Sequence, residues 1–318
     1  MFQKLNCASI SGVKGHFIIL LVLSLAGVTT AQEKPLQTDE LVQSVEEWLQ
    51  ENLDEGVLDA LGVDQDRARK FFAELRRQFA GTYVYDLGAL KETATRLLPV
   101  LEQFEETDPY AVWLRTHLDY FDTANVLRRE MTPKQSAPVR LPSPSPQLQR
   151  SVWVRQLDKR PLPPLAGNYL PRLKRIFIEE RMPPELVWVA EVESSFDPRA
   201  RSPAGAAGLF QLMPHTARSL DLSMWPRDER LQPEKNARAA AKYLRCLYDR
   251  FGDWRLALAA YNAGETRVDT LLKQHKARTF DAIAHRLPAE TQMFVPKIEG
   301  TLRRREGREL ANLKLPRG

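Results

Sequence analysis

Apolar residues return every three or four positions along most of the chain, which is the period of an amphipathic helix. Before residue 132 this period predicts helices at residues 41–53, 66–79, 89–104 and 109–131. After residue 147 it predicts helices at residues 168–180, 183–195, 236–251, 253–264 and 288–306, and the alternation typical of strands is rare there. We therefore expect an all-α fold.

A proline-rich segment separates the two groups of predicted helices. Residues 133–147 contain five prolines, a composition that disfavours helix and strand and favours extended polyproline geometry. The chain has 318 residues, which is about two domains by length. We predict a helical accessory domain over residues 32–132, a linker over residues 133–147 and a second helical domain over residues 148–318.

The first 31 residues have the order of a secretory signal peptide: lysines, an apolar run over residues 17–27, and small residues up to Ala31. An uncleaved membrane anchor is the alternative, although the run is short for a membrane span. Cleavage after Ala31 leaves Cys246 as the only thiol, without an intramolecular disulfide, and its apolar helical neighbours predict a buried, inert side chain. We expect an exported, periplasmic protein, with membrane association left open.

The modest formal net charge of +5 conceals two halves of opposite sign. Residues 32–132 carry 21 acidic and 11 basic side chains, whereas residues 133–318 carry 20 acidic and 33 basic ones. A basic half is typical of nucleic-acid binding, but export argues against that partner. Outside the cytoplasm the polyanions are the polymers of the envelope, which the same electrostatics would attract.

Carboxylates are the strongest candidates for chemistry in this sequence. The histidines do not show the HExxH spacing of a zinc site, and neither a GxSxG nor a Walker motif occurs. Glu191 and Glu193 lie inside the otherwise apolar segment ELVWVAEVESSFDP, where an acid is either paired with a base or kept for a raised pKa. Both faces of this predicted helix are apolar, so periodicity does not choose between the two residues.

Further motifs follow in a fixed order. RSPAGAAGLFQLMP, which begins at Arg201, has small residues that let backbone amides approach a ligand closely. AYNAG, over residues 260–264, places an aromatic residue and an amide before a glycine that ends a helix. PAETQMFVPKI, over residues 288–298, adds the acid Glu290. Each motif is weak alone, and their combination in this order is specific.

In these motifs the sequence resembles the catalytic domain of the soluble lytic transglycosylases, the SLT family, over about residues 166–300. It is especially similar to the type of the membrane-bound lytic murein transglycosylase D. The resemblance implies a lysozyme-like helical domain that acts on peptidoglycan glycan strands, with Glu193 as the acid and base. It also implies residues that bind the glycan or support this acid, namely Ser194, Ser202, Gln211, Met213, Tyr261, Asn262 and Glu290.

The family's chemistry needs one acid because the substrate's N-acetyl group assists. By the resemblance, Glu193 protonates the glycosidic oxygen between MurNAc and GlcNAc and then deprotonates the C6 hydroxyl, which gives a 1,6-anhydro-MurNAc end. No metal or other cofactor is implied. For Tyr261 a core aromatic role is the alternative to packing near Glu193. For Glu290, helix capping is the alternative to orienting the groove through backbone contacts.

Two other functions stay open at this point. A hydrolytic muramidase would recruit Asp197, four residues after Glu193, although a turn role suffices for an acid placed before Pro198. A non-catalytic murein-binding scaffold would keep the fold and recruit an envelope protein partner through residues 32–132. Nucleic acid is not an expected partner.

Overall fold

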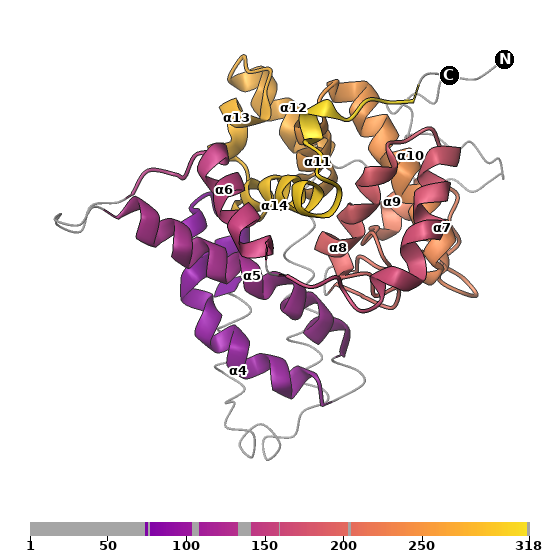
Figure 1. Cartoon of the computed structure of the whole chain (residues 1–318), viewed down its shortest axis with the longest axis horizontal. Coiled ribbons are helices and arrows are strands. Elements are labelled where there is room, and N and C mark those ends of the chain that lie inside the picture. Colours follow the sequence, from indigo (N-terminus) through magenta and orange to yellow (C-terminus); the bar gives the residue numbers. More distant parts are fainter. Residues whose placement is uncertain are drawn as a thin grey trace, which may run out of the picture.

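The computed structural model describes residues 74–75, 77–103, 108–132, 141–158, 160–202 and 205–316. All regular elements of these residues are helices, and the only β-type pairing among them is two isolated bridges, Arg201 with Ala207 and Ala207 with Leu212. The expected all-α fold is confirmed (Figure 1). The predicted signal peptide and the helix expected at residues 41–53 lie outside the described residues.

The helices before the proline-rich segment form a small cluster. The 3₁₀-helix η2 (Val84–Leu90) leads into α4 (Lys91–Leu101), and both pack against the long helix α5 (Asp108–Met131). The apolar face of α5 is buried through residues such as Leu114, Phe121 and Leu127. This period-3.6 stripe is the feature that predicted the helix over residues 109–131.

Helix α6 (Pro146–Leu157) begins inside the segment predicted as a linker. Proline is favourable at the first position of a helix because it has no N–H to leave unpaired, and the Ser145 hydroxyl accepts from the Leu148 N–H as an N-cap. The proline content of this segment predicts only a break between helices, so α6 was not predicted from the sequence.

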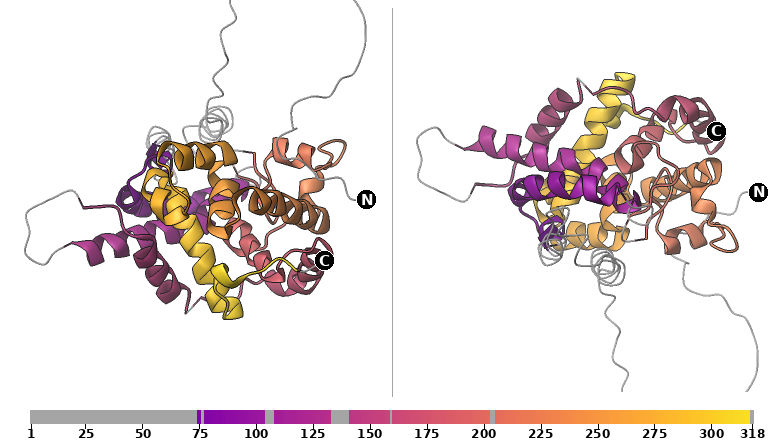
Figure 2. Two further views of the ribbon diagram at one scale, coloured as in Figure 1. Left: turned by 90° about the horizontal axis from the view of Figure 1, so that it is seen from above. Right: turned by 90° about the horizontal axis from the view of Figure 1, so that it is seen from below.

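The two sides of the proline-rich segment share one hydrophobic core. Trp153 on α6 and Met293 on α14 (Ala289–Glu306) belong to the same cluster as the buried residues of α4 and α5. Gly300 makes the close approach of α6 and α14 possible, because a Cβ there would lie 3.2 Å from the Trp153 Cβ. The two views of Figure 2 show the N-terminal helices lying against the rest of the molecule.

The second core surrounds α11 (Trp254–Ala263) and α14, which lie in contact with each other. The remaining elements in chain order are α7 (Ala166–Glu179), η3 (Pro184–Trp188), α8 (Val189–Ser194), α9 (Pro214–Ser219), η4 (Glu229–Leu231), α10 (Pro233–Phe251), α12 (Glu265–Gln274), α13 (Phe280–Ile283), η5 (Ala284–Arg286) and η6 (Leu310–Asn312). Helices α7, α10, α11 and α14 match their predicted ranges closely, whereas residues 183–195 divide into η3 and α8.

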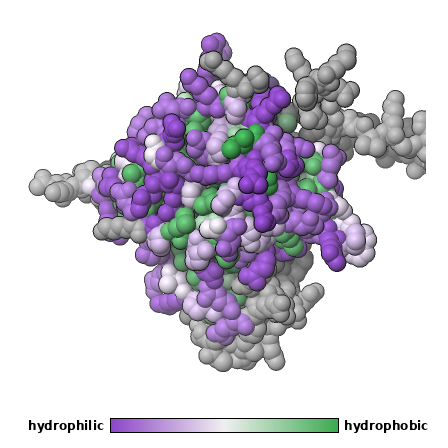
Figure 3. Space-filling model, turned by 45° about the vertical axis from the view of Figure 1, so that its right-hand side comes forward, coloured by the Kyte–Doolittle hydropathy of each residue, from purple (hydrophilic) through white to green (hydrophobic). Residues whose placement is uncertain are grey.

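The exposed surface seen in Figure 3 is mostly hydrophilic, with small separate apolar areas. Within the described residues, every helix is too short or too polar to cross a membrane. Cys246 on α10 is partly exposed, not buried as expected. The inward face of α10 is set by Leu244 and Leu247, and Cys246 lies beside that face.

Candidate active site

The two acids of α8 lie in different surroundings. Glu191 is 4% exposed, and its two carboxylate oxygens accept from Arg305 on α14 at 2.8 and 2.9 Å. Glu193 is partly exposed, and its carboxyl group has neither a hydrogen bond nor an ion pair to any other described residue. The structure therefore makes Glu191 the paired acid and Glu193 the free one, a choice that periodicity left open.

The environment of Glu193 favours its neutral form. Desolvation is the main cause that raises the pKa of this carboxyl well above its ordinary value, and the negative charge of Glu290 adds to the effect. The positive charge of Lys297 acts in the opposite direction. A carboxyl that keeps its proton near neutral pH is suited to act as a general acid.

The chain turns sharply after α8. Ser195 and Phe196 both adopt left-handed backbone conformations, with φ of 51° and 62°. The buried Ser194 hydroxyl bonds to the carbonyl of Leu209 at 2.8 Å and so ties the end of α8 to the following loop. Asp197 accepts from the Arg199 N–H at 2.8 Å, which is the turn role expected for it.

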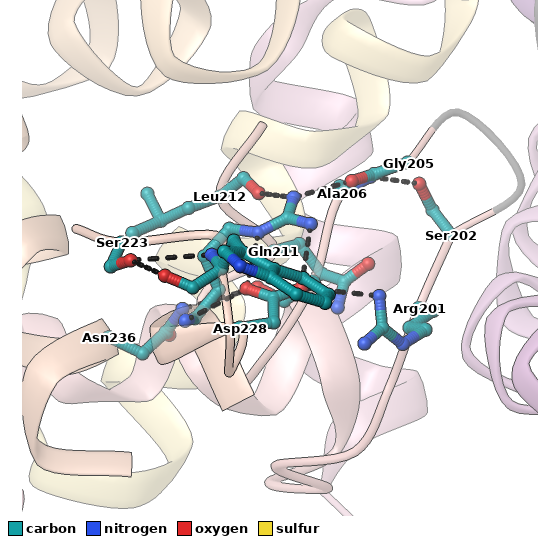
Figure 4. A network of polar contacts seen from close by, with 12 residues as sticks. Arg201, Ser202, Gly205, Ala206, Gln211, Leu212, Ser223, Asp228 and Asn236 are labelled. Atoms are coloured by element: carbon teal, nitrogen blue, oxygen red, sulfur yellow. Dashed lines mark hydrogen bonds and ion pairs between the residues drawn. The ribbon is translucent and has the colours of Figure 1, made fainter. Parts of the chain in front are cut away.

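Buried polar side chains form hydrogen bonds to the backbone of the loop between α8 and α9 (Figure 4). Asn236 accepts from the Phe210 N–H at 2.8 Å, and the Arg230 guanidinium donates to the Gly205 and Leu212 carbonyls at 2.6 and 2.9 Å. Gly208 has a φ of 83°, and a Cβ there would lie 2.0 Å from the Arg230 carbonyl oxygen. The loop therefore requires glycine at this position.

Three of the predicted site residues belong to this loop. Gln211 has a φ of 45°, and its side-chain amide donates to the Ala200 and Gly208 carbonyls at 3.1 and 2.8 Å. The Ser202 hydroxyl accepts from the Ala206 N–H at 3.1 Å within its own turn, and Met213 precedes α9. These contacts show Ser202 and Gln211 holding the loop in shape.

Tyr261 and Asn262 lie at the end of α11 and reach different parts of the site. The Tyr261 hydroxyl donates to the Phe210 carbonyl at 2.5 Å, and the charge of Glu193 contributes, after burial, to raising the pKa of Tyr261. The Asn262 amide donates to Glu290 Oε1 at 3.1 Å, while Asn262 Oδ1 accepts from the Thr291 hydroxyl at 2.6 Å. Tyr261 thus joins the loop to the surroundings of Glu193.

Glu290 lies in the first turn of α14, and its Oε1 accepts from the Asn262 side-chain amide. Burial alone would raise the pKa of this carboxyl, but the net shift is downward because His117, Asn262 and Lys297 favour the charged form. The His117 Nε2 lies 3.8 Å from Glu290 Oε1. The pKa values of the two carboxyls are therefore shifted in opposite directions, that of Glu193 upward and that of Glu290 downward.

Four residues around these acids were not predicted from the sequence: His117, Tyr120, Lys297 and Arg305. Lys297 on α14 is 2% exposed, donates to Asp119 Oδ1 at 2.9 Å, and lies over the Tyr120 ring at 4.4 Å. The sequence feature that could have indicated them is the presence of polar residues on the otherwise apolar faces of α5 and α14. Among the described residues, no group of three or more His, Cys, Asp or Glu side chains is arranged to hold a metal ion.

The fold and the site define an all-helical protein with a free, desolvated glutamic acid whose pKa is raised in part by the charge of a second carboxylate. Residues 176–284 match the family model described as the transglycosylase SLT domain. The match confirms the resemblance seen in the sequence, and it covers the motifs from Glu193 to Asn262. Helix α14, with Glu290, and helix α5 lie outside the matched range.

Curated relatives agree with the family match. The membrane-bound lytic murein transglycosylase D of Escherichia coli strain K12 is 42% identical over 124 residues, which is 38% of this chain and 27% of that protein. The soluble lytic murein transglycosylase of Salmonella typhimurium strain LT2 is 39% identical over 119 residues, which is 35% of this chain and 18% of that protein. The matched segments therefore span 27% or less of these relatives.

A solved structure, the lytic transglycosylase Slt from Pseudomonas aeruginosa, is similar over 79% of this chain and 36% of that one. Its sequence is 22% identical and the TM-score is 0.40.

Proposed function

We propose that this protein is a peptidoglycan lytic transglycosylase that cleaves the β-1,4 bond between MurNAc and GlcNAc. Glu193 is the single acid and base of this reaction. The observation that carries the proposal is the environment of Glu193. Its carboxyl is desolvated, lacks a partner among the described residues, has a pKa raised by burial and by the charge of Glu290, and belongs to the segment matched to the SLT domain. The names of the curated relatives support the activity.

In the first step, the Glu193 carboxyl donates its proton to the glycosidic oxygen while the bond from this oxygen to C1 of MurNAc breaks. The N-acetyl carbonyl of the same sugar stabilises the positive charge that develops at C1, as in substrate-assisted glycosidases. The GlcNAc hydroxyl leaves with the proton. A raised pKa suits this step because Glu193 must hold a proton near neutral pH.

In the second step, the Glu193 carboxylate takes the proton of the C6 hydroxyl, and O6 forms a bond to C1. The product is a 1,6-anhydro-MurNAc end, Glu193 is protonated again, and water is not consumed. Ser194, Ser202 and Gln211 shape the loop beside Glu193, and Met213 lines the groove. Tyr261 holds this loop, while Asn262 orients Glu290.

In this proposal, residues 1–31 are the signal peptide that directs export to the periplasm. Residues 32–132 form the accessory part, and residues 148–318 form the catalytic part. The accessory part is the proposed site for an envelope protein partner. Incubation of the full chain with murein sacculi, followed by mass spectrometry, tests the reaction. We expect 1,6-anhydro ends. Reducing ends alone would indicate a hydrolytic muramidase, and binding without cleavage would indicate a scaffold.

A further inference from the structure

Helix α5, which precedes the proline-rich segment, lies against the helix that carries Glu193. α5 contacts α8, and its residues Thr116, His117 and Tyr120 are 8%, 7% and 2% exposed. Figure 1 shows α5 next to α8 and α14. The N-terminal helices therefore contribute buried polar groups to the surroundings of both carboxyls.

The His117 ring is held in one orientation. Its Nδ1 lies 2.8 Å from the Trp113 carbonyl oxygen, which accepts but does not donate, so Nδ1 carries a hydrogen and Nε2 is the nitrogen that faces Glu290. The ring stacks on Trp113 at 4.1 Å and on Tyr120 at 5.2 Å. Rotation of the ring away from Glu290 would break the hydrogen bond and both stacks.

Lys297 fastens this part of α5 to α14. Its ammonium group donates to Asp119 Oδ1 at 2.9 Å and to the Thr116 carbonyl at 3.1 Å, and Arg160 binds the other oxygen of Asp119 at 2.8 Å. Thr116 and Asp119 flank His117 in the sequence. The distance between His117 and Glu290 is therefore set by an anchor that spans both helices.

The charge of Glu290 connects His117 with Glu193. A negative Glu290 favours the protonated form of Glu193, and His117 and Asn262 favour a negative Glu290. The titratable and charged groups around the two carboxyls are His117, Asp119 and Tyr120 on α5, Glu193 on α8, Tyr261 on α11, Glu290 and Lys297 on α14, and Arg160 before α7. Of these, His117 lies 3.8 Å from Glu290 Oε1, whereas the causes that shift the pKa of Glu193 are burial, Glu290 and Lys297.

We propose that His117 is a positioning residue of the active site: its fixed ring holds the Glu290 carboxylate in place, and through Glu290 it acts on the acid Glu193. This inference rests on the proposed role of Glu193 as the acid. It makes the N-terminal helical part a component of the active site. His117 on α5 and Glu290 on α14 both lie outside the segment matched to the SLT domain.

Three variants of the full chain test the inference. His117→Phe keeps the stacked ring but removes both nitrogens, and the Trp113 carbonyl keeps its hydrogen bond from the Thr116 hydroxyl. His117→Gln keeps a neutral donor toward Glu290 and is expected to restore part of the effect. Thr123→Val is the matched control, because Thr123 is a fully buried residue of α5 that bonds to Gln156, away from the carboxyls.

The first measurement is a carbon-13 NMR titration of glutamate carboxyls, with the two signals assigned from Glu193→Gln and Glu290→Gln. In His117→Phe we expect Glu290 to titrate at higher pH and Glu193 at lower pH, each by about 0.5–1 unit. His117→Gln is expected between this variant and the wild type, and Thr123→Val should match the wild type. Unchanged titrations in both His117 variants overturn the inference.

The second measurement is the pH profile of kcat/KM for murein cleavage. The alkaline limb, which reports loss of the proton from the acid, is expected at lower pH in His117→Phe, with about three- to tenfold slower cleavage above the wild-type limb. An unshifted limb overturns the inference. If the titrations shift as expected but the wild type forms no anhydro ends, the link from His117 to Glu290 holds and the proposed function fails.

Discussion

Arg305 on α14 binds both carboxylate oxygens of Glu191 on α8, at 2.8 and 2.9 Å. Both side chains are nearly inaccessible, with 9% of Arg305 and 3% of Glu191 exposed. Two residues further along α8, Glu193 lacks such a partner among the described residues. The pair therefore neutralises one acid of this helix and leaves the other available for chemistry.

Glu191→Gln is expected to destabilise the protein by about 3–5 kcal/mol, because it leaves the Arg305 guanidinium buried without its carboxylate. Urea unfolding followed by circular dichroism measures this change. Arg303→Gln serves as the control, since Arg303 is 62% exposed and lies 3.5 Å from an exposed Glu309, so its midpoint should stay near the wild type. Equal midpoints for both variants would contradict the role assigned to the buried pair.

Glu193→Gln is expected to reduce the release of muropeptides from sacculi by about 10²–10⁴-fold, the contribution of a general acid and base. Glutamine keeps the size of the side chain, so the fold should be retained. The matched variant Glu185→Gln changes another glutamate of the same segment and should cleave like the wild type. Comparable cleavage by Glu193→Gln and the wild type would exclude Glu193 as the acid.

The same substitution should change how stability depends on pH. The pKa of Glu193 in the folded state is raised above its ordinary value of 4.5. At pH values between the unfolded and the folded pKa, the folded state therefore binds more protons than the unfolded state. The contribution of Glu193 to stability is fully present below the unfolded pKa and is lost as the pH rises through the folded pKa. Glu193→Gln removes this loss.

The difference in Tm, variant minus wild type, is therefore expected to be positive at pH 8 and to shrink toward pH 4. Thermal melting monitored by circular dichroism at several pH values measures it. A difference that stays constant with pH would mean that the folded and unfolded pKa values of Glu193 are equal.

Tyr261→Phe is expected to cost about 1–2 kcal/mol, because the Phe210 carbonyl loses the hydroxyl that donates to it. Cleavage should slow as well, by less than in Glu193→Gln, since the loop beside the acid becomes less fixed. Tyr248→Phe is the control: the Tyr248 ring stacks on Trp254, and its hydroxyl bonds to no described residue. The free energy of unfolding and the rate of murein cleavage are measured for both variants. Identical values would contradict the role of Tyr261 in holding the loop.

Gly208→Ala is expected to destabilise the protein by about 2–4 kcal/mol, because a Cβ would meet the Arg230 carbonyl oxygen at a φ of 83°. Gly167→Ala is expected to stabilise the protein by up to about 1 kcal/mol, because a Cβ there meets nothing within 4 Å and alanine favours the helix. Denaturant midpoints should therefore move in opposite directions. A stable Gly208→Ala variant would show that the loop relaxes around the new methyl group.

Much of the helical framework could be predicted from the sequence. The apolar stripes of α5, α10 and α14 are long enough for the period to define them, because each helix must bury one continuous face. The short α9 and α13 have too few turns to show a period. Helix α6 was missed because its cap, Ser145 followed by Pro146, lies among prolines that also predict a linker.

By itself the sequence determined the all-α class, the long helices and the order of motifs that resembles the SLT family. These depend on local pattern, which each segment carries alone. Only the tertiary structure decided which acid is free and which partners surround it. Arg305 lies 114 residues from Glu191, and Asn262 lies 28 residues from Glu290. Such pairs form because distant helices pack together, and a local pattern does not encode which side chains then meet.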